Sequence, residues 1–400
     1  MRTDLYLFTT HFPTGLSGEL WLYNEILITH KNYERIFIFP DHDVYDPVSL
    51  PSNCFSQQNV LANSEKEVLT VGDLSRIIKI VLSDFVSLAK HGAFASNLKY
   101  NLSLIKKLYK KAKYISKQIE SPERSVLYAY WSDNAATLAC MIKTFKPSVK
   151  AISRAHGYEI YEDLKKDKII PFRNYQNKHI DCIFSVSKKG LEHLKSKYPN
   201  FTNKYSYSYL GTNDNEIAPL SSSNKFSIVT CCNLNIIKRI DLVPSILKHI
   251  KFELTWHLIG DGPEFKKIEK LNSELPSNIK VVYHKHLSQD KVFDFYKENE
   301  VNAILSVSYS EGLPVSMMEA LSFGIPIITT EVGGCSEICT SNTGILLERD
   351  FNSYHVAEKI IEFKSSYMNK EQFRIGCREF WMKNFSAENN YSKFAAEISV

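Results

Sequence analysis

Short apolar runs alternate with longer amphipathic stretches along most of this 400-residue chain. Near its start, residues 4–9 (DLYLFT) and 35–39 (RIFIF) have the length and composition of buried strands. Between them, the stretch 18–31 carries apolar side chains on one helical face, at Leu20, Tyr23, Ile26 and Leu27. Because strand, helix, strand is the repeating unit of a parallel sheet, the sequence predicts an α/β fold.

The alternation forms two sets, separated by a stretch (200–225) that is rich in Asn, Thr and Ser and typical of a linker. Before it, further strands are expected at 125–130, 150–153 and 181–186, and helices at 75–90, 101–119, 134–145 and 188–197. After it, strands are expected at 226–231, 254–259, 279–283, 302–307 and 325–329, and helices at 238–250, 263–275, 288–298, 314–323 and 353–364.

Two Rossmann-like, doubly wound parallel-sheet domains are therefore expected, at residues 1–215 and 222–378. Ligands of open parallel sheets bind beyond the carboxyl ends of the strands, so we expect both sheets to face a central cleft.

The composition excludes several classes of protein. A net charge of +5 is too small to indicate nucleic-acid binding. No apolar run approaches the roughly 18 residues that span a bilayer, and the first residues lack the features of a signal peptide, so a cytoplasmic protein is expected.

No metal site is expected. The eight cysteines are interpreted as free thiols, several of them buried, and Cys335 and Cys339 lack the second pair that a zinc site needs. Asp41-His42-Asp43 is a D-x-D triplet, for which metal binding is only a minor alternative.

The most informative stretch is 302–338. An expected strand ends in a polar loop, and Glu311-Gly312-Leu313-Pro314 leads into a helix that begins at Pro314 or Val315 and stops at Gly324. The amides at such a helix tip, together with the helix dipole, form an anion site suited to a diphosphate.

Two carboxylates flank this anion site, Glu311 in the loop and Glu319 eight residues later in the helix. A carboxylate beside a diphosphate is unfavourable unless it binds hydroxyls, so the pair suggests a ligand with a sugar at each end of the phosphates. A nucleotide-sugar has that layout. The alternative is an ordinary strand-helix unit with two surface glutamates.

This segment resembles the signature of the family-four retaining glycosyltransferases of the GT-B fold, which has two glutamates eight positions apart, the first followed by Gly-Leu/Phe-Pro. The resemblance implies that Glu311 contacts the transferred sugar and that Glu319 holds the ribose. It also implies that the backbone of Gly312, Leu313, Pro314 and Val315 lies against the sugar and phosphates, with no cofactor or metal required.

Lys238 follows a strand and would neutralise the departing diphosphate, assisted by Arg239. The family commonly carries an Arg a few residues earlier, where this chain has Cys232 or Asn233. The alternative for Lys238 is an exposed lysine at the start of a helix.

Three further motifs resemble family positions. Gly15 and Gly18 would let a phosphate approach the first strand-to-helix loop, and Gly260 ends a strand in a Gly-x-Gly turn. His156 lies where the family often has a catalytic-site histidine near the reacting sugar. The alternatives are a tight turn at Gly15 and Gly18, a plain strand-to-helix turn at Gly260 and a structural role for His156. Ser187 is a weaker candidate on the acceptor side.

Two further segments predict a membrane contact or core packing in the first domain and a crossing of the C-terminus onto that domain. Residues 101–119 carry six lysines and no acid, with apolar side chains on one helical face. They would either contact an anionic membrane surface, as in a peripheral membrane protein, or pack into the first domain's core. In the family, C-terminal helices such as 379–400 cross back onto the first domain.

Together these features predict a retaining, metal-independent hexosyltransferase of surface polysaccharide biosynthesis. The donor would be a UDP-sugar, or alternatively a GDP-sugar, and the acceptor a saccharide or lipid-linked saccharide. Glu311, Lys238 and His156 are the expected catalytic residues. The alternatives are a nucleotide-sugar epimerase or hydrolase on the same fold, or a non-catalytic nucleotide-sugar-binding protein.

Overall fold

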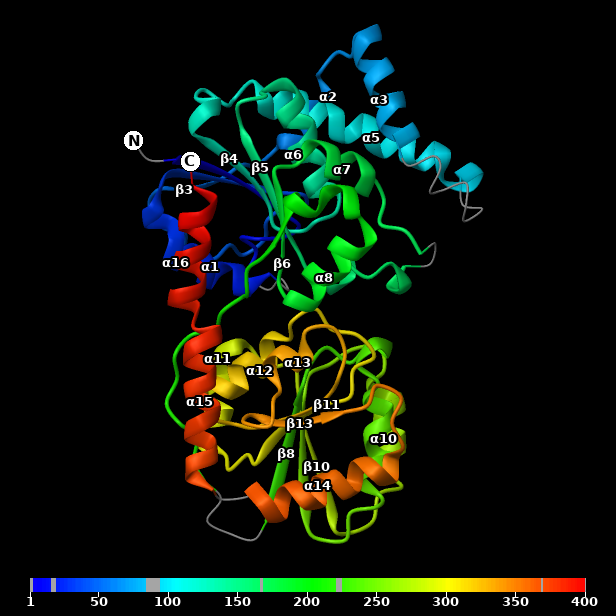
Figure 1. The fold of residues 1–400 in the computed structure, drawn as a ribbon, viewed down its shortest axis with the longest axis vertical. Coiled ribbons are helices and arrows are strands. Elements are labelled where there is room, and N and C mark those ends of the chain that lie inside the picture. Colours follow the sequence, from blue (N-terminus) through cyan, green and yellow to red (C-terminus); the bar gives the residue numbers. More distant parts are fainter. Residues whose placement is uncertain are drawn as a thin grey trace. The chain divides into compact units, whose positions relative to one another are not determined.

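The computed structural model describes residues 3–15, 19–83, 94–165, 168–220, 225–367 and 370–399. It divides into two compact units, each built on one parallel sheet (Figure 1). Unit 1 comprises Met1–Ser208 and Tyr391–Val400, and unit 2 comprises Tyr209–Asn390. The expected α/β class with two doubly wound parallel sheets is confirmed.

Unit 1 contains a seven-stranded sheet in the order β3-β2-β1-β4-β5-β6-β7, and all of its strand pairs are parallel. Its strands are β1 (Thr3–Thr9), β2 (Tyr33–Pro40), β3 (Cys54–Ser56), β4 (Ser125–Ala129), β5 (Lys150–Ala155), β6 (Cys182–Ser185) and β7 (Tyr205–Tyr207). The strand order reverses between β1 and β4, which is where doubly wound sheets bind ligands.

Helices cover both faces of this sheet. They are α1 (Leu20–Thr29), α2 (Val60–Glu65), α3 (Val71–Ser83), α5 (Phe94–Ser116), α6 (Asn134–Phe145), α7 (Arg173–His179), α8 (Lys188–Lys197) and the last turns of α16 (Ala387–Ile398). Residues of α3, α5 and α6 fill the core on one face. On the other face, α1 packs together with Phe394, Ala395 and Ile398 of α16 (Figure 1).

Unit 2 contains a six-stranded parallel sheet in the order β10-β9-β8-β11-β12-β13. Its strands are β8 (Phe226–Cys231), β9 (Leu254–Ile259), β10 (Ile279–Lys285), β11 (Ala303–Ser306), β12 (Ile327–Thr330) and β13 (Gly344–Leu347). Its helices are α9 (Val243–Leu247), α10 (Phe265–Asn272), α11 (Gln289–Glu298), α12 (Val315–Ser322), α13 (Cys335–Ile338), α14 (Ser353–Tyr367) and α15 (Glu371–Phe385).

Several expected elements differ from the observed ones. The single helix expected at 238–250 is instead two 3-10 turns, Ile236–Lys238 and Ile240–Leu242, followed by the short α9. The cause is Arg239, whose left-handed backbone (φ 50°) cannot continue a helix. The expected linker 200–225 contains β7, and residues 84–90 of the helix expected at 75–90 lie outside the described residues.

The crossing of 379–400 begins later than the family pattern implies. Helix α15 belongs to unit 2, where Arg374 donates to the carbonyls of Gly324 and Val301. Only Tyr391 onward belongs to unit 1, where the Arg154 guanidinium lies 4.1 Å from the centre of the Phe394 ring. Part of the segment expected to cross is therefore a structural element of unit 2.

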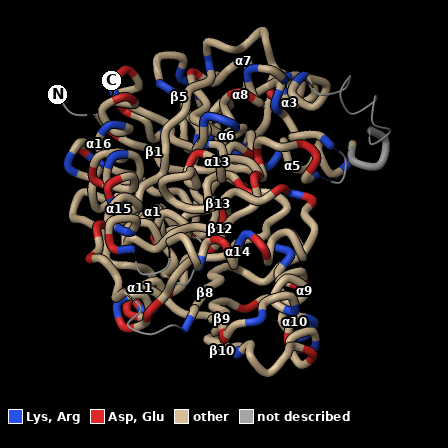
Figure 2. Tube along the Cα trace, turned by 60° about the horizontal axis from the view of Figure 1, so that its bottom comes forward, with Lys and Arg blue, Asp and Glu red and all other residues tan. Residues whose placement is uncertain are grey.

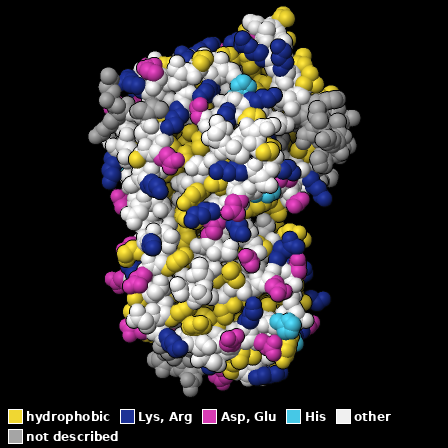
Figure 3. All heavy atoms as spheres, viewed as in Figure 1, with side chains coloured by type: hydrophobic (Ala, Val, Ile, Leu, Met, Phe, Trp, Pro, Cys, Tyr) yellow, Lys and Arg dark blue, Asp and Glu magenta, His cyan; other side chains and the backbone are white. Residues whose placement is uncertain are grey.

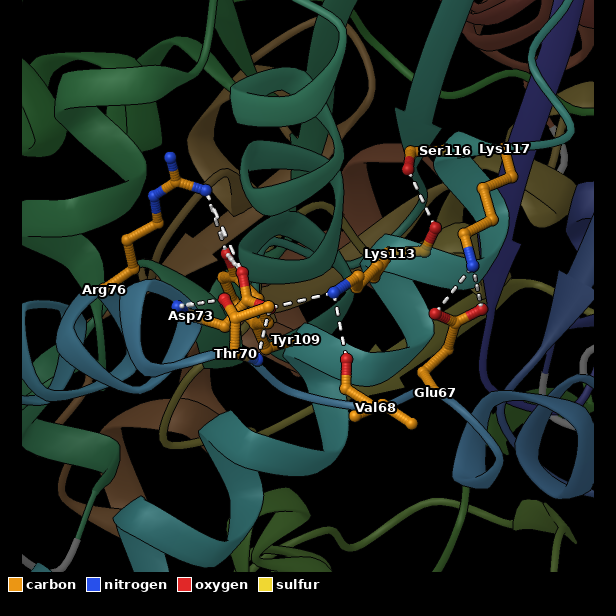
Figure 4. Close-up of polar contacts among 9 residues, drawn as sticks. All are labelled: Glu67, Val68, Thr70, Asp73, Arg76, Tyr109, Lys113, Ser116 and Lys117. Carbon is orange, nitrogen blue, oxygen red and sulfur yellow. Dashed lines mark hydrogen bonds and ion pairs between the residues drawn. The ribbon is translucent and has the colours of Figure 1, made fainter.

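Helix α5 contains most of the lysine-rich segment 101–119. Its apolar face lies in the unit 1 core, so this face is not available to a membrane. Lys113 and Lys117 form ion pairs with Asp73 and Glu67 (Figure 4), and Lys111 is buried against Asp41. The apolar face of the segment therefore packs into the core of unit 1, as the second alternative expected.

Candidate active site

The candidate site of unit 2 lies at the carboxyl end of β11, where the chain turns into α12. Pro314 takes an extended conformation (ψ 115°) before the helix begins at Val315, whose amide belongs to the first helical turn and has no carbonyl within the helix to bind. Leu313 is buried, so only its backbone can face a ligand. The expected helix tip is therefore present. At its other end the helix stops before Gly324, which has a left-handed conformation.

A second loop supports this helix tip from below. Gly334 N–H donates to the carbonyl of Gly312 at 2.8 Å. Gly333 is left-handed (φ 49°), and a Cβ at this position would lie 1.7 Å from the carbonyl oxygen of Glu311. Only glycine fits there, so the shape of the Glu311 loop depends on the Gly-Gly pair that follows β12.

Lys238 and Glu311, which are 73 residues apart in the sequence, form an ion pair with Nζ and Oε1 2.5 Å apart. Ser308 Oγ donates to the same carboxylate oxygen at 2.7 Å. Burial alone would lower the pKa of Lys238, but the charge and hydrogen bond of Glu311 outweigh burial and raise it. A charged lysine and an oriented carboxylate thus meet beside the helix tip.

Glu319 lies on α12 and is 8 % exposed. Gln289, the first residue of α11, donates from Nε2 to Glu319 Oε1 at 2.6 Å. Burial raises the pKa of Glu319 to about 7, although the hydrogen bond from Gln289 opposes the rise. Sequence reasoning missed Gln289, because nothing in the sequence indicates that the start of α11 reaches α12.

The Arg239 side chain donates its hydrogen bonds to backbone carbonyls of the protein. Its Nε donates to the carbonyl of Val307 at 2.9 Å, and Nη2 donates to the carbonyls of Ser308 and Arg349. The side chain thereby ties the loop after β11 to the 3-10 turns. These contacts give Arg239 a loop-holding role, and its contribution to donor binding stays a prediction.

Gly260 brings three strand ends together. Its backbone is left-handed (φ 136°), and a Cβ would lie 1.9 Å from the carbonyl oxygen of Cys232. Its N–H donates to the carbonyl of Lys285 at 2.7 Å. The close approach of the ends of β8, β9 and β10 is therefore enough to explain a glycine at this turn, as the plain-turn alternative expects.

In unit 1, the loop after β1 is held by a residue that sequence reasoning missed. The buried Glu19 carboxylate accepts hydrogen bonds from the amides of Thr10, His11 and Phe12 and from the Trp131 indole N–H. Gly15 donates to the carbonyl of Asp46 at 2.9 Å, while Gly18 lies outside the described residues. Because one carboxylate collects three consecutive amides, the loop has a defined shape.

His156 follows β5 and is enclosed by aromatic rings. Its ring centre lies 4.4 Å from that of Trp131 and 5.2 Å from that of Tyr130. Nδ1 lies 3.5 Å from Oε1 of Glu159, a side chain that is 3 % exposed. The nearby Ser187 caps α8 by accepting a hydrogen bond from Gly190 N–H, which favours a structural role for this weaker candidate.

A cavity of about 230 Å³ opens at the carboxyl ends of β1, β2 and β4. It lies where the order of strands reverses, and its polar lining includes Thr10, Asp41, Lys111 and Asp133. Lys111 is buried and pairs with Asp41 at 2.5 Å. The first acid of the D-x-D triplet therefore has a lysine partner, and it lines a cavity that sequence reasoning did not anticipate.

Two features are absent from the described residues. None of their helices is long and apolar enough to cross a membrane. Nor do they contain a group of three or more His, Cys, Asp and Glu side chains arranged to hold a metal ion.

Part of unit 2 is similar to a known protein family. Residues 214–379, which include Lys238, Glu311 and Glu319, match the family described as glycosyl transferases group 1. This part of the chain is similar to the group 1 glycosyltransferases. The resemblance on which the sequence predictions depend is thereby confirmed.

Relatives extend the similarity beyond this domain. The O-antigen biosynthesis glycosyltransferase WbnH of Escherichia coli is 25 % identical over 267 residues, covering 64 % of this chain and 72 % of WbnH. Among solved structures, the lipopolysaccharide outer core galactosyltransferase WaaB aligns with a TM-score of 0.67 at 16 % identity, over 98 % of this chain and 99 % of WaaB. Anabaena HepE, solved with UDP and glucose, aligns with a TM-score of 0.69 at 13 % identity, over 99 % of each chain. The GT-B fold is confirmed.

Proposed function

We propose that this glycosyltransferase moves a hexose-type sugar from a UDP-sugar to a saccharide or lipid-linked saccharide acceptor, with retention of anomeric configuration and without a metal ion. The observation that carries the proposal is the Lys238–Glu311 ion pair beside the tip of α12, with Glu319 buried on the same helix. HepE, which is similar in fold, was solved with UDP and glucose, and this supports the choice of donor.

In the proposed mechanism, the amides at the tip of α12 and Lys238 stabilise the negative charge that develops on the departing diphosphate. Glu311, held by Ser308, accepts hydrogen bonds from hydroxyls of the transferred sugar. Glu319 accepts from the ribose hydroxyls. The diphosphate, the transferred sugar and the ribose would thus each bind a different group of the protein.

The acceptor is proposed to bind at the unit 1 cavity. Its Asp41 and Lys111 side chains offer an acceptor and a donor of hydrogen bonds to sugar hydroxyls. His156, held near Glu159, would contact the reacting sugar. We propose a front-face path in which the leaving phosphate takes the acceptor proton, with Glu311 and Glu319 engaged by hydroxyls of the donor.

The names of the relatives suggest a pathway. WbnH is an O-antigen biosynthesis enzyme and WaaB acts on lipopolysaccharide outer core. We therefore propose a role in the synthesis of a surface polysaccharide.

Donor choice is tested by thermal unfolding with UDP-, GDP- and ADP-sugars. A sugar nucleotide at about 100 times its dissociation constant adds about 2.7 kcal/mol to the free energy of unfolding. The best donor is then incubated with and without saccharide acceptors, and nucleotide release is measured. Consumption without any acceptor would favour an epimerase or hydrolase, and binding without release under any condition would favour a non-catalytic binding protein.

Site residues are tested with Lys238→Met and Glu311→Gln. Loss of one group that stabilises transition-state charge lowers kcat by about 100-fold to 1,000-fold, and we expect this for Lys238→Met. The matched control is the exposed pair of Lys248 and Glu274 in the same unit, whose Lys248→Met and Glu274→Gln variants should transfer sugar normally. Near wild-type turnover of both site variants would refute the site assignment.

A further inference from the structure

Helix α3 of unit 1 has more apolar surface than its core can cover. Its inward side, which includes Ile77, Ile80 and Val81, is buried. Four further apolar residues are 85 %, 45 %, 50 % and 49 % exposed, namely Val71, Leu74, Ile78 and Leu82. At 100° per residue these four fall within one arc of about 80°, next to the buried arc. We call this stripe of four residues the α3 face.

The orientation of α3 is fixed by polar contacts on its inward side. Asp73, which is buried, accepts hydrogen bonds from the Tyr109 hydroxyl at 2.9 Å and from Lys113 Nζ at 2.8 Å (Figure 4). Thr70 N–H donates to the same carboxylate. Because α5 holds Asp73 inward, α3 cannot rotate to bury its outer stripe without breaking an ion pair and a buried hydrogen bond.

The charge around the α3 face is positive. Within the described residues 71–83 and 94–116, Asp73 is the only acidic side chain, and Lys113 neutralises it. Lys79 is the exposed α3 cation nearest the stripe, whereas Arg76 lies on the opposite side of the helix and pairs with Asp73. Of the six lysines on α5, Lys99, Lys106 and Lys107 remain beside those that bind groups elsewhere in unit 1, and Lys and Arg occur along both helices in Figure 2. Figure 3 shows apolar side chains interleaved with Lys and Arg over α3.

From this combination we propose that the α3 face docks on a bilayer that contains anionic lipid. Aliphatic side chains along one side of a helix enter the boundary between headgroups and acyl chains, while adjacent cations attract the lipid phosphates. Lys79, one residue from Ile78 and three from Leu82, is placed to contact headgroups. The docking surface thus lies on α3 instead of on the lysine-rich segment 101–119, and it does not depend on the proposed sugar transfer.

The full chain is tested by co-flotation with vesicles of phosphatidylcholine containing 30 % phosphatidylglycerol, and with phosphatidylcholine alone. We expect binding to the anionic vesicles, and binding that weakens as salt rises from 50 to 500 mM. Leu74→Ser/Ile78→Ser should weaken the partition coefficient at least about tenfold, because two inserted side chains are lost. Lys79→Gln should weaken it by less and should reduce its salt dependence.

The matched control is Ile361→Ser/Met382→Ser, which removes two comparably exposed apolar residues from unit 2. It should bind vesicles like the wild type, and unchanged thermal unfolding of both double variants would show that the fold is intact. Failure of the wild type to float with anionic vesicles would overturn the proposal, as would equal binding by the α3 variant. A different outcome is a dimer in light scattering that the α3 double variant converts to a monomer, without any vesicle binding. That result would assign the face to a second copy of the chain and would also overturn the proposal.

Discussion

The two units use the same architecture but hold their candidate site residues differently. In unit 2, glycines let loops touch, as at Gly333 and Gly260, and the ion pair of Lys238 and Glu311 lies beside a helix tip. In unit 1, a buried network joins Glu25 of α1, Arg154 of β5 and the Phe394 ring of α16, and the β1 loop depends on the Glu19 carboxylate. Close backbone approach leaves a local pattern in the sequence, whereas long-range polar packing does not.

The family match covers 214–379 and leaves all of unit 1 outside it. The Glu311 loop requires glycine at Gly333, because a Cβ there would lie 1.7 Å from the carbonyl oxygen of Glu311. The unit 1 network requires only that charges and rings meet in space. We therefore expect the two units to respond differently to substitution.

The largest effect is expected for Glu25→Gln in unit 1. Arg154 is fully buried, lies 3.3 Å from Glu25 and cannot lose its charge. An unpaired buried guanidinium costs about 3–5 kcal/mol, which urea unfolding of the variant would measure. Glu25→Leu/Arg154→Met should recover most of that loss, and a Glu25→Gln protein as stable as wild type would show that the network contributes little.

The next effect is expected for Gly333→Ala in unit 2. The added Cβ would lie 1.7 Å from the Glu311 carbonyl oxygen in a left-handed backbone, and such overpacking costs about 1–3 kcal/mol. Gly376→Ala in α15 is the control, because its Cβ would meet nothing within 4 Å and alanine favours a helix by about 0.5–1 kcal/mol. If both variants unfolded at the same temperature, the close approach of the two loops would not be needed for stability.

The smallest effect is the pH dependence of donor affinity in unit 2. Burial raises the pKa of Glu319 to about 7, so the ionised carboxylate that ribose hydroxyls require is present above that pH and lost below it. Affinity for a UDP-sugar should therefore rise about tenfold from pH 6 to pH 8, as calorimetry would measure. Glu319→Gln should bind with a weak affinity that does not change over this range, and a wild type with flat affinity would contradict the ribose contact.

Much of the donor-side site could be predicted from the sequence. The helix from Val315 and its end at Gly324 agree with the expected strand-loop-helix pattern. The ion pair of Lys238 with Glu311 is a tertiary contact that this pattern did not specify. The helix expected at 238–250 was wrong, because propensity gave no sign that Arg239 would adopt a left-handed conformation to reach three carbonyls. Gln289, Glu19 and the cavity at Lys111 were not predictable, because their partners lie far away in sequence or on other elements.

The sequence alone therefore determined the two parallel sheets, their alternation with helices and the acidic pair around a helix tip, since these depend on local periodicity and backbone geometry. Only the tertiary structure decided which charges are satisfied within the protein. Four lysines of the 101–119 segment bind groups elsewhere in unit 1, namely Lys110, Lys111, Lys113 and Lys117. The tertiary structure also decided that α3, and not this segment, exposes apolar side chains, because burial is a property of the elements packed around a helix and not of the helix itself.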